Sequence, residues 1–260
     1  MAWRISAGGE HLLRTAALPS TTNFSVCGWQ YTLQRSPATT YGNIWDLEDT
    51  TYPSDSSAWI GLVYNDALPS LRLTTTGGGT DFASAPSDNA WFFWALTCSG
   101  TGAGTFIGYW VAASGAAFVS ANQAGVSFAP GSMLWGEDTF DAWVDGRIAG
   151  VKVWDAVLTS AELWSERWSL TPVRRANLHL FAPGFRHTDL EDMSGNGKTL
   201  TAGGTLSTEE GPPVPWRTSR ARRSIAIAAA AGDTFIEGLS RIEQGMKAAT
   251  AAGMGGVLIE

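Results

Sequence analysis

The feature that most constrains this chain is a series of short strand-like runs, separated by turn residues, that extends to about residue 206. In residues 24–34, alternation places Phe24 and Val26 on one face of a strand. Cys27 and Trp29 fall on the opposite face. Strands that recur this often, without long helices between them, predict a two-sheet sandwich or a barrel.

Residues 89–100 are apolar on both faces, which indicates a strand that is covered on both sides. Together with residues 104–113, which follow a Gly-rich turn, they predict a hairpin near the middle of a sheet. The chain has two cysteines, Cys27 and Cys98, and each lies in a strand-like run. We expect two buried free thiols, with a single disulfide as the alternative, because two cysteines make no disulfide framework.

A short helix interrupts the strands after Asp155. Either Asp155 or Thr159 can cap its first turn. Thr159 stands three residues before Glu162, which is the spacing of a capping box. We expect Leu163 and Trp164 to pack inward from this helix.

Composition narrows the class of protein. Hydrophobic residues make up 44% of the chain and charged residues 16%, which suits a packed core and not a disordered chain. The net charge of −7 gives no electrostatic support for a nucleic-acid partner. The longest apolar stretch, residues 225–231, is too short to span a bilayer, and the N-terminus lacks the pattern of a signal peptide. We therefore expect a soluble protein without a membrane partner.

The C-terminal part differs in composition from the strand-rich part. Residues 207–223 are rich in proline and arginine and are expected to form a linker. Residues 224–260 are rich in alanine and are expected to form a helical tail for oligomerisation or anchoring. Four apolar residues with coiled-coil spacing would form its seam: Phe235, Leu239, Ile242 and Met246.

Residues 145–163 (DGRIAGVKVWDAVLTSAEL) resemble the closing signature of laminin-G-like, concanavalin A-like jelly rolls. In that family, a strand of the type Gly-x-Ile-Asp-Glu-Val-x-Ile-Tyr runs into a short helix of the type Ala-Leu-Ser-x-x-Glu-Ile. The matching positions are Gly146, Ile148, Val151, Val153, Trp154, Leu158, Ser160, Glu162 and Leu163. The resemblance implies an all-β, two-sheet antiparallel jelly-roll sandwich with one short helix, and we expect this domain to occupy residues 1–206.

Residues 178–201 resemble a further segment of the same family, which contains the pattern Asp-x-Ser-Gly-Asn-Gly. In the family this segment usually lies near the beginning of the domain. Its position after the helix predicts a shifted strand order, with the two chain ends on adjacent strands. Where the family pattern has Asp-Glu, this chain has Ala149 and Gly150, so a role of those carboxylates is not carried over.

The carboxylates give little support for catalysis. Relatives that cleave glycosides use a Glu-x-Asp-x-x-Glu run, in which alternate residues share one face of a strand. No such run occurs in this sequence. Asp46 and Glu48 share a face, but we interpret them as a solvated strand end and not as an acid–base pair. We therefore expect no catalytic residue and no enzyme, and a glycan-cleaving enzyme with atypical carboxylates is the weakest hypothesis.

Calcium is the common ion of this family and takes six to eight oxygen ligands. Two acidic loops, residues 46–55 and 136–145, could supply such ligands. The candidate metal ligands are Asp46, Asp49, Asp138 and Asp141. Hydrated loops without a metal are the alternative, and no other cofactor is expected.

The tryptophans divide into two groups. Trp29, Trp94, Trp154 and Trp164 match core positions of the family pattern. The other group lies near loops or strand ends, where an aromatic face could stack on a sugar ring or fill a subunit interface. These candidate ligand-binding residues are Trp45, Trp59, Trp135 and Trp143.

Jelly rolls that are followed by a Pro-rich linker and an Ala-rich tail resemble bacteriophage and prophage virion proteins. The first hypothesis is a non-enzymatic virion structural protein of the decoration, head-fibre or tail-associated kind, assembled in the host cytoplasm. Its partners would be further copies of itself and other virion proteins. The alternative is a carbohydrate-binding module that mediates adhesion to cell-surface glycans.

Overall fold

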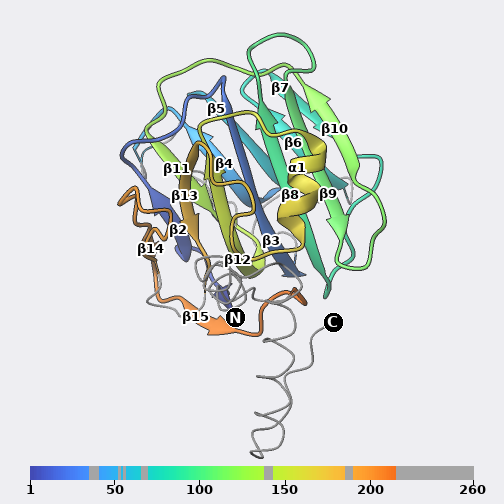
Figure 1. Ribbon diagram of the computed structural model, residues 1–260, viewed down its shortest axis with the longest axis vertical. Coiled ribbons are helices and arrows are strands. Elements are labelled where there is room, and N and C mark those ends of the chain that lie inside the picture. Colours follow the sequence, from blue (N-terminus) through green and yellow to red (C-terminus); the bar gives the residue numbers. More distant parts are fainter. Residues whose placement is uncertain are drawn as a thin grey trace, which may run out of the picture. The chain divides into compact units, whose positions relative to one another are not determined.

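The computed structural model describes residues 1–34, 41–51, 54, 57–65, 70–137, 143–184 and 190–214. These residues form two antiparallel sheets and one short helix, which confirms the predicted jelly-roll sandwich (Figure 1). They belong to one compact unit, Met1–Pro215. The predicted tail, with Phe235, Leu239, Ile242 and Met246, lies outside the described residues.

The first sheet has eight strands in the described part of the chain, and we call it the eight-stranded sheet. Its order is β10–β9–β8–β3–β12–β1–β15, and β13 also pairs with β12. The bounds are β10 (Val119–Gln123), β9 (Phe106–Ala112), β8 (Trp91–Cys98), β3 (Phe24–Gln34), β12 (Asp145–Trp154), β1 (Ala2–Ile5), β15 (Ser207–Glu209) and β13 (Leu178–Ala182).

The second sheet has seven strands among the described residues, and we call it the seven-stranded sheet. Its order is β14–β2–β11–β4–β5–β6–β7. The bounds are β14 (Thr201–Gly203), β2 (His11–Arg14), β11 (Ser132–Trp135), β4 (Tyr41–Glu48), β5 (Trp59–Asn65), β6 (Ser70–Thr75) and β7 (Gly78–Asp81).

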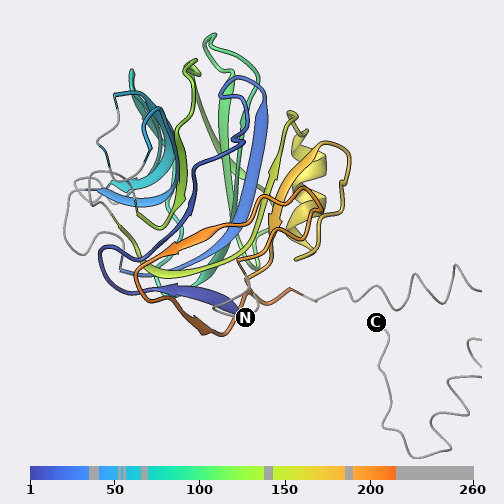
Figure 2. The ribbon, with the colours of Figure 1, turned by 90° about the vertical axis from the view of Figure 1, so that its left-hand side faces the viewer.

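The sandwich has two apolar layers, and both follow from the alternation of its strands. Phe24 and Val26 of β3 pack between the two sheets. Cys27 and Trp29 lie on the opposite face of the strand, as predicted, and pack on the outer face of the eight-stranded sheet. Figure 2 shows helix α1 (Ser160–Arg167) on that outer face, on the side away from the seven-stranded sheet. A helix is needed there because an apolar sheet face must be covered.

Strand β8 is apolar on both sides because both of its faces are covered. Phe92 and Trp94 face the core between the sheets, whereas Phe93 and Ala95 face the layer under α1. Its last residue, Cys98, is buried, and both it and Cys27 are free thiols, as expected. The predicted hairpin is formed by β8 and β9.

Along one of its two edges, strand β12 changes its partner strand. Its first half pairs with β1 and its second half with β13. Between the halves, Gly150 has a φ of +63°, and its N–H donates to the carbonyl of Pro183 at 3.1 Å. A Cβ at Gly150 would lie 3.1 Å from the Leu170 side chain, and Ala149 is completely buried. These are the positions where the family pattern has Asp-Glu, and neither offers space for a carboxylate here.

The two ends of the domain meet on adjacent strands, as predicted. Strand β1 lies between β12 and β15, with Ala2 opposite Glu209. Residues 207–209 were expected in the linker, so the boundary at residue 206 is corrected. The pairing explains the difference, because without β15 the strand β1 would expose an unpaired sheet edge.

The described part of the chain contains no helix of the length and hydrophobicity that crossing a membrane requires.

Candidate functional site

The predicted metal ligands are only partly described. Asp138 and Asp141 lie outside the described residues, whereas Asp46 lies on β4 and Asp49 follows that strand. The Asp49 carboxylate accepts hydrogen bonds from the backbone N–H and the hydroxyl of Ser57. Burial alone would raise the pKa of Asp49, but these hydrogen bonds outweigh it and lower the pKa. Among the described residues, no three His, Cys, Asp or Glu side chains gather as a metal site, and calcium binding stays a prediction.

The pair Asp46 and Glu48 differs from the expectation of a solvated strand end. Only 4% of Asp46 and 1% of Glu48 is exposed. Trp45 and Leu47 face the core, so alternation turns both carboxylates to the outer face of the seven-stranded sheet. The expectation was wrong because position along a strand does not show which other segments cover its outer face.

The four candidate ligand-binding tryptophans have different environments. Trp45 and Trp135 are completely buried in the core between the sheets, and Trp45 packs against Phe24 with ring centroids 5.6 Å apart. Neither ring has a face for a sugar, so the structure corrects this expectation for both. Trp59 is half-buried on β5, and Trp143 is half-buried beside Glu137. A ligand-binding role of these two stays a prediction.

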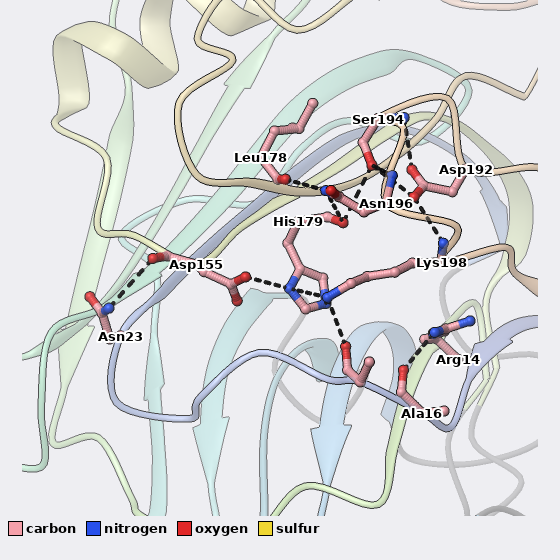
Figure 3. Close-up of polar contacts among 11 residues, drawn as sticks. Arg14, Ala16, Asn23, Asp155, Leu178, His179, Asp192, Ser194, Asn196 and Lys198 are labelled. Atoms are coloured by element: carbon pink, nitrogen blue, oxygen red, sulfur yellow. Dashed lines mark hydrogen bonds and ion pairs between the residues drawn. The ribbon is translucent and has the colours of Figure 1, made fainter.

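Polar side chains gather around His179 on β13 (Figure 3). Its Nδ1 lies 2.7 Å from the Asp155 carboxylate, and the Nζ of Lys198 lies 3.0 Å from both ring nitrogens. The same Nζ donates to the carbonyl of Ala17 at 3.3 Å. These contacts join the turn after β12, strand β13 and the loop that follows it. The cluster therefore holds distant parts of the chain together.

The segment with the Asp-x-Ser-Gly-Asn-Gly pattern folds around the carboxylate of Asp192. This carboxylate accepts backbone hydrogen bonds from Phe181, Ser194 and Lys198 at 2.9–3.0 Å, and one from the Ser194 hydroxyl at 2.7 Å. Burial alone would raise the pKa of Asp192, but the hydrogen bonds outweigh it and lower the pKa. Asn196 donates to the carbonyl of Leu178 at 2.6 Å (Figure 3). The pattern thus has a structural role in this chain.

Helix α1 is positioned by its first turn. Thr159 is the N-cap, and it forms the predicted capping box with Glu162. The backbone N–H of Thr159 donates to the Glu162 carboxylate at 2.8 Å, and this bond lowers the pKa of Glu162. Asp155, the alternative cap, instead pairs with His179.

A buried ion pair fixes the middle of α1 to the sheet. The Nζ of Lys152, on β12, donates to the Glu166 carboxylate at 2.8 Å and to the carbonyl of Ser169 at 2.6 Å. The backbone N–H groups of Val173 and Arg174 also donate to Glu166. Both charges are therefore paired and hydrogen-bonded, as buried charges must be.

Arg167 fixes the end of α1. It is completely buried, and its guanidinium donates to the carbonyls of Ala112, Ala113 and Gly115 at 2.6–2.9 Å. Burial lowers the pKa of this guanidinium, but an arginine pKa is so high that the group stays charged. Its central carbon lies 4.7 Å from the Trp164 ring centroid and 4.2 Å from that of Trp168. One cation thus holds two aromatic rings in place.

Trp168 is the functional candidate that the sequence did not indicate. Among the described tryptophans it alone is exposed, with 45% of its surface accessible. It is the C-cap of α1, and its ring meets that of Trp164 at 6.2 Å and 79°. The closeness of Trp154, Trp164 and Trp168 in the sequence was the available signal, but spacing alone does not distinguish an exposed ring from a buried one.

The sequence matches no known family model, and no curated protein is similar to it. A solved structure from Bacteroides ovatus, provisionally named a carbohydrate-binding protein, has a TM-score of 0.53 and 15% identity. The match covers 82% of this chain and 61% of that one, so this chain spans about three fifths of its length. At this identity the similarity shows a shared fold.

Two further solved structures are similar at lower scores. The heptameric SAP-like pentraxin from Limulus polyphemus has a TM-score of 0.49 and 12% identity, with 82% of this chain and 97% of that chain covered. Tailspike protein 2 from an Escherichia coli O157:H7 bacteriophage has a TM-score of 0.48 and 13% identity, with 70% and 26% covered.

Proposed function

We propose that this protein is a non-enzymatic structural component of a bacteriophage virion, of the decoration, head-fibre or tail-associated kind. The jelly roll is displayed outward, and the Ala-rich tail, residues 224–260, oligomerises it or anchors it to other virion proteins. On this proposal the protein is assembled into the particle in the host cytoplasm. The order of a jelly roll, a Pro-rich linker and an Ala-rich tail along the sequence, which resembles that of virion proteins, suggests this role.

The observation that carries the proposal is the pairing of the first and last strands. Ala2 lies opposite Glu209, so the domain begins and ends at one edge of the eight-stranded sheet. The last strand before the proposed attachment segment is therefore paired with the first strand of the domain. Attachment through one end of the domain suits a surface component of a particle.

The polar groups of the described region support a structural, non-catalytic role. Glu166 is paired with Lys152 under α1, and Asp192 accepts hydrogen bonds from three backbone N–H groups. His179 lies between Asp155 and Lys198. Each of these groups joins segments of the fold.

A truncation tests the proposal. A protein that ends at Val214 keeps β15 and should stay folded as a monomer, but it should no longer join the oligomer or the particle. Analytical ultracentrifugation and particle incorporation are the measurements. A second truncation, after residue 206, removes β15 and serves as a control for loss of folding. Unchanged assembly by the protein that ends at Val214 would overturn the proposal.

Carbohydrate-binding adhesion to cell-surface glycans is the second candidate function. The exposed indole of Trp168 favours it, because an aromatic ring held at a surface can stack on the apolar face of a sugar. The Bacteroides ovatus protein with the shared fold has a provisional carbohydrate-binding name. A glycan array, probed with the full-length protein with and without calcium, tests this function. Absence of binding under both conditions would remove it.

A further inference from the structure

We infer that the exposed face of Trp168, together with the hydroxyl of Ser165, is a binding site for one neutral pyranose ring. This inference rests on the second candidate function, carbohydrate binding, and assigns it to α1. The site lies on the outer face of the eight-stranded sheet, whereas the predicted Trp45, Trp59 and Trp135 belong to the seven-stranded sheet.

The ring of Trp168 presents one face to solvent and is fixed from the other. The guanidinium of Arg167 lies over the ring, 4.2 Å from its centroid, and Arg167 is itself completely buried. The exposed 45% of Trp168 therefore belongs to the opposite face and the free edge. Three backbone carbonyls bind Arg167, so the ring is held before a ligand arrives. A side chain that is already ordered loses less entropy on binding.

The surface of α1 beside the ring is open and polar. Ala161 and Ser165, seven and three residues before Trp168, are exposed on the same side of the helix. Both side chains are small, so neither covers the indole. The Ser165 hydroxyl donates to the carbonyl of Ala161 at 3.0 Å, which leaves its lone pairs to accept from a sugar hydroxyl. An apolar ring face next to a hydroxyl acceptor matches a pyranose, which has an apolar C–H face and a polar rim.

The electrostatics favour a neutral ligand. Arg167 already occupies one face of the indole, and its charge opposes a second cation on the other face. The net charge of −7 gives the chain as a whole no long-range attraction for an anionic ligand. A neutral sugar meets no such repulsion and needs no such attraction.

The exposed area favours a small ligand over a protein. The accessible part of Trp168 amounts to about 100 Å², since a tryptophan side chain offers up to about 250 Å². A stable protein interface needs about 800 Å² from each partner. The exposed face of Trp168 therefore suits one sugar ring as its ligand.

The test begins with the full-length protein on an array of neutral, amino and sialylated glycans, followed by titration of the best neutral glycan. Trp168→Ala should bind roughly tenfold or more weakly, because a central tryptophan carries much of such a binding energy. Trp168→Phe should lose less, and Ser165→Ala about two- to fivefold. Val173→Ala, also an exposed apolar residue near the end of α1, is the matched control and should stay within about twofold.

The outcomes separate the site from the function. Neutral-glycan binding by the wild type that Trp168→Ala, Trp168→Phe and Ser165→Ala all leave unchanged would overturn the site and keep the adhesion function. Binding of charged glycans alone would overturn the neutral ligand class. Absence of any binding by the wild type would overturn both. Cooperative thermal unfolding and a wild-type circular dichroism spectrum should show that each variant is folded, even where loss of the contact with Arg167 lowers its stability.

Discussion

The outer faces of the two sheets differ in chemistry and in how they are covered. On the eight-stranded sheet, the outer face carries apolar side chains such as Trp29 and Phe93, and α1 covers them. On the seven-stranded sheet, alternation turns Asp46, Glu48 and Arg72 outward. The apolar face could be predicted, because a strand that is apolar on both sides must be covered twice. The burial of the carboxylates on the polar face was not predicted, because polarity alone does not show that a carboxylate is exposed.

Buried charge distinguishes the two faces further. Under α1, Lys152 and Glu166 are both almost completely buried and are paired at 2.8 Å. On the seven-stranded sheet, Arg72 and Asp81 form an ion pair at 3.3 Å, with 26% and 30% of their side chains exposed. Water screens the second pair and not the first, so equal substitutions on the two faces should have unequal effects.

The largest effect is expected for Lys152→Met. This change leaves the Glu166 charge buried without its partner, which should lower the free energy of unfolding by about 3–5 kcal/mol. Arg72→Met is the matched control and should cost about 1 kcal/mol or less. Urea denaturation of both variants measures the difference. Equal losses would contradict the distinction between the faces.

Shortening a buried apolar side chain should likewise lower the stability more under α1 than on the outer face of the seven-stranded sheet. Leu163, on α1, is completely buried against the eight-stranded sheet, and Leu163→Ala should cost about 2–5 kcal/mol. Val63, on the outer face of the seven-stranded sheet, is 8% exposed, and Val63→Ala should cost about 1–2 kcal/mol. Thermal and urea unfolding provide the comparison, and a larger loss at Val63 would reverse it.

A smaller, pH-dependent effect is expected at Asp192, which orders the loop after β13. Asp192→Asn should cost about 1–3 kcal/mol at neutral pH, because the charged acceptor of four hydrogen bonds is lost. The folded-state pKa of Asp192 is lowered, so its contribution is complete above the unfolded value of about 3.9 and disappears as the pH falls through the folded value.

The difference between the wild type and Asp192→Asn should therefore shrink below about pH 4. Unfolding free energies at neutral and acidic pH measure it. Met193→Ala, in the same loop and exposed, should change stability by no more than about 0.5 kcal/mol at either pH. A difference that grows on acidification would contradict the role of the Asp192 carboxylate.

The smallest effect is expected at the start of α1. Thr159→Ala removes the N-cap acceptor and should cost about 1 kcal/mol. Ser165→Ala, on the exposed side of the same helix, should stay within about 0.5 kcal/mol. Chemical denaturation resolves the two. A loss at Ser165 as large as that at Thr159 would show that the capping box does not position the helix.

Local patterns in the sequence account for much of this fold. Alternation in β3 predicted that Phe24 and Val26 lie on one face and Cys27 and Trp29 on the other, because successive residues of a strand must face opposite ways. The spacing of Thr159 and Glu162 predicted the cap, because the reciprocal hydrogen bonds form within one turn.

Other features depend on distant parts of the chain. Strand β15 was not predicted, because its three residues become a strand only beside β1. The complete burial of Trp45 and Trp135 depends on which face of the seven-stranded sheet packs inward. The exposure of Trp168 depends on Arg167, which the carbonyls of Ala112 and Gly115 hold in place. No local pattern records these contacts.

Fluorine NMR of the full-length protein with 5-fluorotryptophan tests most directly whether α1 both seals its sheet and presents a binding surface. The Trp168 signal is assigned by its loss in Trp168→Phe. On addition of a neutral glycan that the protein binds, this signal should shift, whereas that of the buried Trp154 should stay in place. A glycan that shifts other tryptophan signals and leaves Trp168 unchanged would contradict the account.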